Sequence, residues 1–344
     1  MRLARSLAMA LAAIAASSPA AAQDAEAQFY RDKTVTVVIG TSAGGGVDTY
    51  GRLLARHIGK HIPGNPRVVP ANMPGAGTLV ATVHIYSAAA RDGTQIGAVL
   101  AGAILDPLLG TGARKFEPTQ FNYVGNANLE TQVCVVRTDA PVKSFEDVFK
   151  TEMVVGATGP GSAILLYPLF LKNFFGAKIK LVSGYPGSRE VSLALQKGEV
   201  HATCGLNWSS AKVQFPGLAS GAEFKVLVQE DVAPNAELAK MGVPLTARFV
   251  KGDEDRRVLE VFYAQSKINR VFIAPPEVPP QRVAALRKAF MATIADPELK
   301  AEADKMQLDL DATPGEEIQA LVSRLYATPP AIVERMRAAI TGGN

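Results

Sequence analysis

Short runs of β-branched and apolar residues alternate along the chain with segments of helical periodicity. The run from Thr34 to Ile39 (TVTVVI) is typical of a strand that is buried on both faces. Leu53, Leu54 and Ile58 then follow at helical spacing. A small, glycine-rich stretch that starts at Thr41 separates the two patterns. The sequence therefore predicts a strand, a bare loop and a helix in that order.

The same alternation continues through the first half of the chain. Strands are predicted at 65–71 and 95–100, with a helix at 79–89 between them. This β-α-β-α-β order predicts a parallel sheet with helices on both faces. The strand candidates 121–126 and 131–137 have no helix between them, which predicts a crossing into a second lobe.

A second strand–loop–helix unit opens the other half. The predicted elements there are a strand at 152–157, a helix at 163–175, a strand at 180–183, a helix at 189–197 and a strand at 201–205. The segment 225–229 is expected to be a strand that returns to the first lobe. Beyond residue 255 the pattern is nearly all helical, broken at 270–274 and by the two prolines that follow.

These patterns predict an α/β protein of two lobes, each a mainly parallel sheet covered by helices, with crossing strands between the lobes. A length of 344 residues also exceeds one average domain. We expect lobe 1 to comprise 23–125 and 228–344, and lobe 2 to comprise 126–227.

The first residues have the pattern of a secretory signal. Arg2 and Arg5 precede an apolar run at 7–16, and the small residues Ala20 to Ala22 follow. The run is too short to span a bilayer. We therefore expect 1–22 to be a signal peptide cleaved after Ala22, and the rest to be exported.

Composition narrows the function further. Apolar residues make up 48% and charged residues 20% of the chain, as in an ordinary globular protein. Without the two signal arginines the formal net charge falls from +4 to +2. Because basic residues do not cluster with aromatic ones, nucleic-acid binding is not expected. Cys134 and Cys204, the 2 cysteines, are open to two interpretations: a disulfide permitted by export, or two buried thiols.

The two glycine-rich loops are the candidate binding site. Each leaves backbone N–H groups at the positive end of a helix, where an anion binds well. Asp48 and Arg52 form a favourable i,i+4 pair at the start of the first helix. Two such loops on separate units can hold one small anion from both sides.

Four residues at strand ends or helix starts of the second half extend this candidate site. Trp208 equally suits a core position, and Arg189 equally suits solvent. The expected ligand-binding residues are Thr41, Ser42, Ala43, Gly44, Gly45 and Asp48 in the first unit, Thr158, Gly159, Gly161 and Ser162 in the second, and Tyr185, Arg189, Asn207 and Trp208.

Other chemistries receive weaker support. Gly40 to Gly44 matches G-x-S-x-G, so an exported hydrolase with Ser42 as nucleophile is the main alternative. No upstream oxyanion loop and no recognisable triad partner accompany it. His57 and His61 share a helix face but lack a third metal ligand, so a solvated helix end is favoured. No nucleotide-binding motif follows a strand.

Motifs along nearly the whole mature chain resemble the substrate-binding proteins of tripartite tricarboxylate transporters, known as the Bug family. The matching stretches are A-G-G-G-x-D at 43–48, R-L-L-A at 52–55, N-x-P-G-A-G at 72–77, D-G at 92–93, G-P-G-S at 159–162, Y-x-G at 185–187, G-E-V at 198–200, A-P-P-x-V-P-P-Q-R-V at 274–283 and A-D-P-E at 295–298.

The resemblance implies a two-lobed, flytrap-like periplasmic binder that closes on a small carboxylate, largely through main-chain groups and water. It implies no enzymatic step, no cofactor and no metal. The implied partners are a small organic acid and, transiently, the membrane permease subunits of a tripartite transporter, with the binder itself a monomer. A sensor that presents ligand to a receptor is a further alternative. Thr41 and Ser42 replace the family's usual proline, and Ser188 and Arg189 replace its small residues after Y-x-G.

Overall fold

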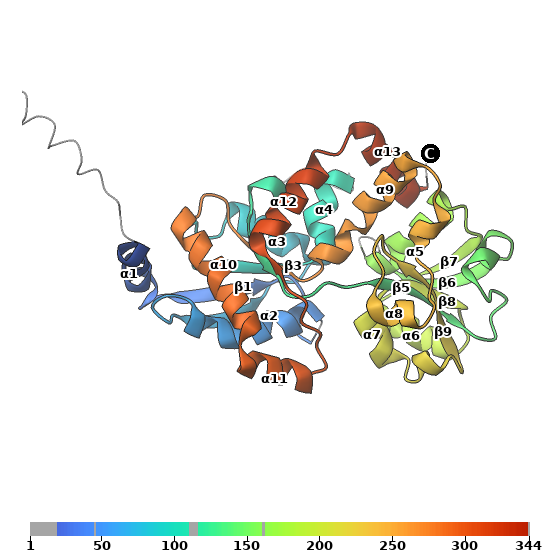
Figure 1. Ribbon diagram of the computed structural model, residues 1–344, viewed down its shortest axis with the longest axis horizontal. Helices are drawn as coiled ribbons and strands as arrows, with labels where there is room; N and C mark the ends of the chain where they lie inside the picture. The colour runs from blue at the N-terminus through green and yellow to red at the C-terminus, as the bar shows by residue number, and fades with distance from the viewer. Residues whose placement is uncertain (1–18, 45, 110–115, 160–161, 343–344) are drawn as a thin grey trace, which may run out of the picture.

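The computed structural model describes residues 19–44, 46–109, 116–159 and 162–342, and it shows two lobes side by side (Figure 1). Most of the predicted signal peptide, residues 1–18, lies outside the described residues, so its cleavage remains a prediction. The described chain starts in helix α1 (Pro19–Tyr30), whose last residue Tyr30 is completely buried and donates a hydrogen bond from its hydroxyl to the Gly93 carbonyl.

The first lobe is built on a sheet with the strand order β11-β4-β10-β3-β1-β2. The strands β1, β2 and β3 are parallel, whereas β10 is antiparallel to both of its neighbours. The strands of this sheet are β1 (Thr34–Ile39), β2 (Arg67–Asn72), β3 (Gln95–Val99), β4 (Asn122–Asn126), β10 (Val271–Ala274) and β11 (Thr313–Pro314).

Helices cover this sheet, and several of them begin at a proline, which is tolerated in the first turn. Pro280, Pro297 and Pro330 are the first residues of three helices. The helices of this lobe are α2 (Gly46–His57), α3 (Leu79–Ser87), α4 (Ala101–Leu109), α9 (Asp253–Tyr263), α10 (Pro280–Ala295), α11 (Pro297–Lys305), α12 (Gly315–Tyr326) and α13 (Pro330–Thr341).

The second lobe is built on a sheet with the order β7-β6-β8-β5-β9, in which β7, β6 and β8 are parallel and β5 is antiparallel to both of its neighbours, β8 and β9. Its strands are β5 (Gln132–Arg137), β6 (Met153–Thr158), β7 (Ile179–Tyr185), β8 (Ala202–Asn207) and β9 (Phe224–Glu230), and its helices are α5 (Ala163–Phe174), α6 (Ser188–Gln196), α7 (Trp208–Gln214) and α8 (Ala236–Lys240). The predicted fold class, two mainly parallel sheets covered by helices, is confirmed.

One expected strand lies in the other lobe. The segment 225–229 does not return to the first lobe, because β9 pairs with β5 at the edge of the second sheet. The chain stays with the second lobe beyond it: Leu238 packs in the core of that lobe, and Phe249 packs against Phe145. The second crossing between the lobes therefore follows residue 249 rather than 227. The sequence does not indicate this position, because no apolar strand marks the crossing.

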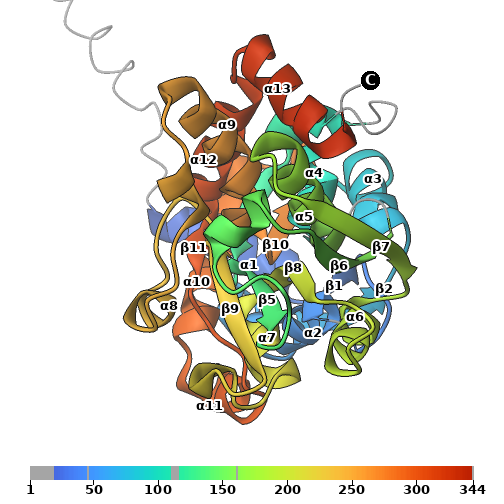
Figure 2. The same cartoon turned by 90° about the vertical axis from the view of Figure 1, so that its right-hand side faces the viewer.

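Aromatic residues join the two lobes away from the sheets. Helix α5 of the second lobe packs against α9 and α13, which lie at the top of the molecule in Figures 1 and 2. Phe170 stacks on Phe262 with ring centroids 3.9 Å apart, and Tyr167 lies 4.9 Å from the same ring. These contacts fix the position of α5, and so of the loop at its start.

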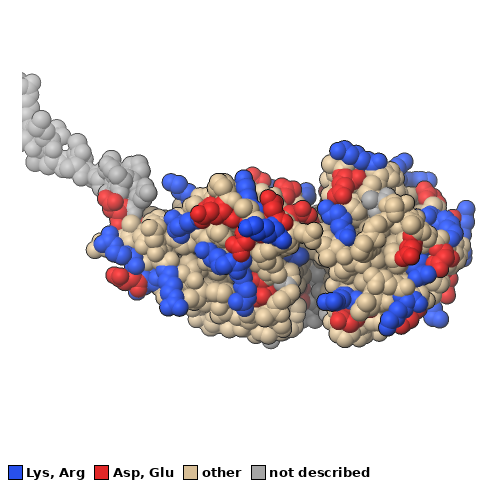
Figure 3. Space-filling model, turned by 90° about the horizontal axis from the view of Figure 1, so that it is seen from below, with Lys and Arg blue, Asp and Glu red and all other residues tan. Residues whose placement is uncertain are grey.

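The surface shows acidic and basic residues interspersed over both lobes, with a notch where the lobes meet (Figure 3). No helix among the described residues is both long and apolar enough to cross a membrane.

Candidate functional site

A cavity of about 510 Å³ lies between the lobes and takes lining residues from both. The first lobe contributes the starts of α2 and α4, and the second contributes the loops after β6, β7 and β8. The described residues that line it are Gly46, Leu100, Ala101, Gly102, Gln132, Thr158, Gly159, Ser162, Ala163, Ile164, Tyr167, Pro186, Gly187, Ser188, Gly205, Leu206, Asn207, Ser210, Gln265, Asn269 and Arg270.

Four helices of nine residues or more begin at this cavity. The lining includes Gly46, Ala101, Ala163 and Ser188, the first residues of α2, α4, α5 and α6. The helices α5 and α6 receive no hydrogen bond from the side chain at the N-cap position. Their first N–H groups are therefore available to a ligand, and the aligned helix dipoles favour a negative one.

The second glycine-rich loop places two hydroxyl groups at the cavity. The Thr158 and Ser162 hydroxyls are hydrogen-bonded to each other, and Ser162 also donates to the Gly159 carbonyl at 3.0 Å. Hydroxyl hydrogens rotate, so a bound acid can accept from either group. Gly161, predicted as part of this loop, lies outside the described residues.

Asn207 also lines the cavity, held by a chain of amides. Gln132 donates from its amide nitrogen to the Asn207 side-chain oxygen at 3.1 Å, and Tyr167 donates its hydroxyl to the Gln132 oxygen at 3.1 Å. The amide nitrogen of Asn207 has no hydrogen-bond partner within the described chain, so it can donate to a ligand.

Arg270 is a lining residue of the cavity that sequence reasoning missed. It stands directly before β10 and is the only charged residue among the described lining residues. Its Nε atom is buried without a hydrogen-bond partner, as is the side-chain nitrogen of neighbouring Asn269. Burial lowers the pKa of the guanidinium, yet an arginine side chain keeps its charge in proteins. The one signal in the sequence was a charged residue at the edge of an apolar strand.

The first glycine-rich loop lies differently from the second. Among its described residues only Gly46 lines the cavity, whereas Ser42, Ala43 and Gly44 are exposed and Thr41 is partly buried. Gly45 lies outside the described residues.

Asp48 is buried beneath this loop rather than open to the cavity. Its carboxylate accepts from the Gly44 N–H at 2.8 Å, from Arg52 at 2.9 Å and from Asn72 at 2.7 Å. Burial raises the pKa of Asp48, but the hydrogen bonds from Asn72, Gly44 and Arg52 outweigh it, so the pKa lies below its ordinary value.

Three more of the predicted residues do not line the cavity. Trp208 is buried in the core of the second lobe and donates its indole N–H to Glu237 at 2.7 Å. Tyr185 packs at the edge of the same core, next to the lining residue Pro186. Arg189 is exposed in the first turn of α6. The structure thus brings Thr158, Gly159, Ser162 and Asn207 together and leaves these three outside.

The histidines do not support the alternative sites. His84 pairs with Gln95 at 3.2 Å, and His201 accepts from the Val154 N–H at 3.1 Å. Neither is hydrogen-bonded to Ser42, which is exposed.

His57, the last residue of α2, and His61, which follows α2, belong to an ion-pair cluster at α11 and the residue before it. His57 contacts Glu302 at 2.7 Å, and His61 contacts Asp296 at 2.8 Å. His57, Asp296 and Glu298 are spaced so that they could surround a metal, but the Lys60 ammonium already contacts Asp296 at 2.7 Å. A lysine thus supplies the positive charge that these carboxylates face.

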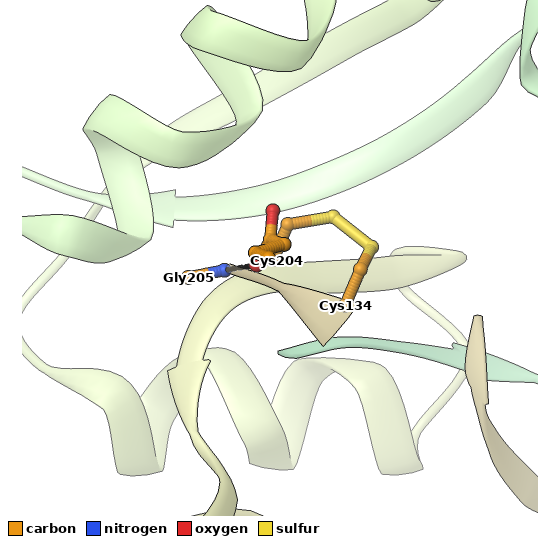
Figure 4. Close-up of a disulfide and its surroundings, with 4 residues drawn as sticks. Cys134, Cys204 and Gly205 are labelled. Atoms are coloured by element: carbon orange, nitrogen blue, oxygen red, sulfur yellow. Dashed lines mark hydrogen bonds between the residues drawn. A yellow bond between two sulfur atoms is a disulfide. The ribbon is translucent and has the colours of Figure 1, made fainter. Parts of the chain in front are cut away.

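The open question about the cysteines is settled in favour of a disulfide, which joins Cys134 of β5 to Cys204 of β8 (Figure 4). Both cysteines are completely buried, and Gly205, next to Cys204, lines the cavity. The Gly205 N–H donates to the Glu230 carboxylate oxygen Oε2 at 2.6 Å, and burial raises the pKa of Glu230 to about 8. The disulfide therefore lies directly behind the cavity wall.

Comparison with known proteins agrees with this architecture. No protein-family model and no curated protein matches the sequence. A TctC solute-binding protein from Polaromonas is 19% identical, with 91% of this chain and 99% of that one covered and a TM-score of 0.67. The periplasmic binding protein BugD is 22% identical, covering 89% and 97%, with a TM-score of 0.63. MatC from Rhodopseudomonas palustris, with bound malate, is 20% identical, covering 89% and 98%, with a TM-score of 0.61.

At these identities the likeness concerns the fold. The chain has the two-lobed fold of periplasmic solute-binding proteins. Within that class it resembles the TctC and Bug proteins over nearly its whole length, so the fold expected from the sequence motifs is confirmed.

Proposed function

We propose that the protein is a periplasmic solute-binding protein that captures a small organic carboxylate between its lobes. It delivers this acid, as a monomer, to the membrane subunits of a tripartite transporter. The binding step involves no bond making or breaking, no cofactor and no metal.

One observation carries the proposal: four helix N-termini and one guanidinium surround a single cavity whose described lining contains no acidic residue. The starts of α5 and α6 offer N–H groups without a side-chain cap, and all four helix starts carry a partial positive charge, so their electrostatic effects add at the cavity. The resulting positive electrostatic potential stabilises a bound anion, whereas a neutral solute gains little from it. The malate bound to MatC, which has the same fold, is an acid of this kind.

The test is a thermal-shift screen of the exported form with mono-, di- and tricarboxylates, each paired with the corresponding neutral amide. A ligand that binds only the folded state raises the melting temperature, and the rise grows with the ratio of the ligand concentration to Kd. We expect at least one acid to raise it and the matching amide to have no effect at the same concentration. Stabilisation by amides and sugars but by no acid would contradict the proposal.

Delivery is tested separately, by uptake of the identified acid in cells that carry or lack this chain. We expect uptake at low acid concentration to need the binding protein. Normal uptake without it, combined with ligand-dependent binding to a receptor, would favour a sensor.

A further inference from the structure

We propose that the Arg270 guanidinium forms the ion pair with the acid group of the ligand, and that Gly46 and Tyr50 hold it in position for this contact. The inference rests on the proposed function and makes it more specific, because it assigns ligand recognition to a side chain rather than to main-chain groups alone.

The first observation is that no described carboxylate is in direct contact with the Arg270 guanidinium. Among the described residues its one side-chain hydrogen bond is a long one, 3.4 Å from Nη1 to the Asn269 carbonyl. The nearby carboxyl group of Glu130 is buried and accepts hydrogen bonds from Asn128 and Ser209 instead. A partly buried charge without a partner is costly to the folded state. Such a group is kept where a ligand supplies the missing partner.

The second observation is that the main chain of Arg270 is fixed. Its N–H donates to the Asn126 side-chain oxygen at 2.8 Å, and its carbonyl accepts from the Ala127 N–H at 3.0 Å. These bonds anchor the residue to the end of β4, where the chain leaves the first lobe. The guanidinium therefore projects from a rigid base into the cavity between the lobes.

The third observation concerns the two residues that flank the guanidinium. Its carbon lies 5.5 Å from the centroid of the Tyr50 ring, and the Tyr50 hydroxyl is itself fixed by donation to the Asp309 carbonyl at 2.7 Å. On another side, a Cβ at Gly46 would lie 3.0 Å from Nη2, closer than side chains normally pack. Tyr50 supports the guanidinium as a cation–π partner, and Gly46 leaves room for it.

The chemistry of the expected ligand follows from the fork geometry of arginine. A planar carboxylate can accept two parallel hydrogen bonds from one guanidinium, which a lysine ammonium cannot copy. The hydroxyls of Thr158 and Ser162 and the start of α5 face the same cavity from the other lobe. The ligand therefore contacts both lobes, and the two oxygens of one of its carboxylates accept hydrogen bonds from Arg270.

The decisive experiment measures Kd by calorimetry for wild type and Arg270→Gln, with the carboxylate from the screen and with its neutral amide. We expect Arg270→Gln to weaken acid binding by at least about 30-fold, as expected for removing one half of a buried charge pair. The variant should also lose its preference for the acid over the amide. Because the empty protein no longer holds an unpaired charge, its melting temperature should not fall.

Two variants test the geometry while keeping the charge. Arg270→Lys should lose at least about tenfold in affinity, since the fork is gone. Gly46→Ala should lose about threefold to tenfold, because the guanidinium must shift. The matched controls are Arg257→Gln, at an exposed position of α9, and Gly252→Ala, where a Cβ would meet nothing closer than 3.9 Å. Neither control should change Kd.

The outcomes separate the two proposals. If carboxylates bind wild type and Arg270→Gln within threefold of each other, the role of Arg270 is refuted while the proposed function stands. If Arg270→Gln unfolds, Arg270→Lys and Gly46→Ala decide alone, and unchanged affinity in both refutes the inference. If no carboxylate binds the wild type, the proposed function fails and the inference fails with it.

Discussion

The two glycine-rich loops look alike in the sequence but lie differently at the cavity. In the second loop, Thr158, Gly159 and Ser162 line the cavity between the lobes. In the first, the described residues before Gly46 do not. Both follow a parallel strand and precede a long helix, so neither topology nor glycine content explains the difference.

The difference comes from one acceptor. Asp48 lies beneath the first loop and takes the Gly44 N–H, while Asn72 donates to both the Asp48 carboxylate and the Thr41 carbonyl. The Gly44 N–H and the Thr41 carbonyl of this loop are therefore hydrogen-bonded within the first lobe, whereas the buried Thr41 hydroxyl has no partner among the described residues. The second loop has no carboxylate inside it, and its hydroxyls remain at the cavity. A glycine-rich loop binds a ligand only where its own chain leaves donors free.

The largest expected effect concerns the disulfide of the second lobe. The Cys134–Cys204 disulfide ties β5 to β8 behind the cavity wall, and it uses both cysteines of the chain, so the first lobe has no such bond. Replacing both cysteines by alanine should lower the free energy of unfolding by about 3–4 kcal/mol, because the bond closes a loop with a sequence separation of 70 residues. Denaturant titration of the double variant measures this loss. Hydrogen exchange should show that amide protection falls mainly in the second lobe. An equal fall in both lobes would show that the disulfide does not stabilise the second lobe in particular.

The next largest effect tests whether the first loop is structural. Asp48→Ala removes the acceptor for Gly44, Arg52 and Asn72 and should cost about 2–3 kcal/mol of stability, toward the low end for a buried pair because Arg52 is partly exposed. Ligand affinity should fall far less than in Arg270→Gln. If affinity falls and stability does not, Asp48 belongs to the binding site after all.

The pH dependence of this variant gives an independent check. The folded-state pKa of Asp48 lies below its ordinary value, so its contribution to stability is fully present above about pH 4 to 5, the range of unfolded carboxyl groups. That contribution is lost as the pH falls through the folded-state pKa. The gap in stability between wild type and Asp48→Ala should therefore be constant near neutral pH and narrow in acid. A gap that widens in acid would contradict the assignment.

These contrasts show where sequence reasoning was sufficient. Strand β1 has the predicted limits, Thr34 to Ile39, because a continuous β-branched run leaves few alternatives. The Asp48–Arg52 pair was also predicted from its spacing. The ion pair with Arg52, however, also occupies the Asp48 carboxylate. The hydrogen bond from Asn72 to this carboxylate depends on the register of β1 and β2, which the sequence does not show. Local patterns predicted the elements but not which polar groups remain free.

Arg270 shows the limit most clearly. Its neighbours in space, Gly46 and Tyr50, lie more than two hundred residues earlier in the chain. They meet because β10 inserts antiparallel between β3 and β4, a long-range pairing by a strand of 4 residues. The charge beside an apolar strand is the one signal near Arg270 in the sequence, and it does not by itself indicate a cavity. The return of β9 was mispredicted for a related reason, since an apolar edge strand fits either sheet.

A smaller effect compares matched serines of the two loops. Ser162→Ala should weaken carboxylate binding by about 1.5–2 kcal/mol, the lower part of the range for a hydrogen bond to a charged group. Stability should fall by about 0.5–1.5 kcal/mol, because the side chain does not cap α5 but its hydrogen bonds to Thr158 and Gly159 are lost. Ser42→Ala, in the exposed part of the first loop, should change binding by less than about 0.5 kcal/mol. Calorimetry on both variants compares the loops directly, and a larger loss for Ser42→Ala would reverse the comparison.

The smallest effect is expected at Arg189, whose guanidinium is exposed at the start of α6 while the neighbouring Ser188 lines the cavity. Arg189 is not among the described residues that line the cavity, so its charge interacts with the proposed anion only across solvent. Interactions of this kind are weak and are screened by salt. Arg189→Ala and Arg189→Lys should each change ligand Kd by less than about 2.5-fold at physiological ionic strength. A small loss in Arg189→Ala at low salt should disappear when salt is added, and Arg189→Lys should behave as wild type throughout. A loss of tenfold or more in Arg189→Lys that persists at high salt would show direct contact, since only a bound fork distinguishes the two cations. In that case the lobes must close further around the ligand than the structure shows, and the second lobe would carry a guanidinium of its own opposite Arg270.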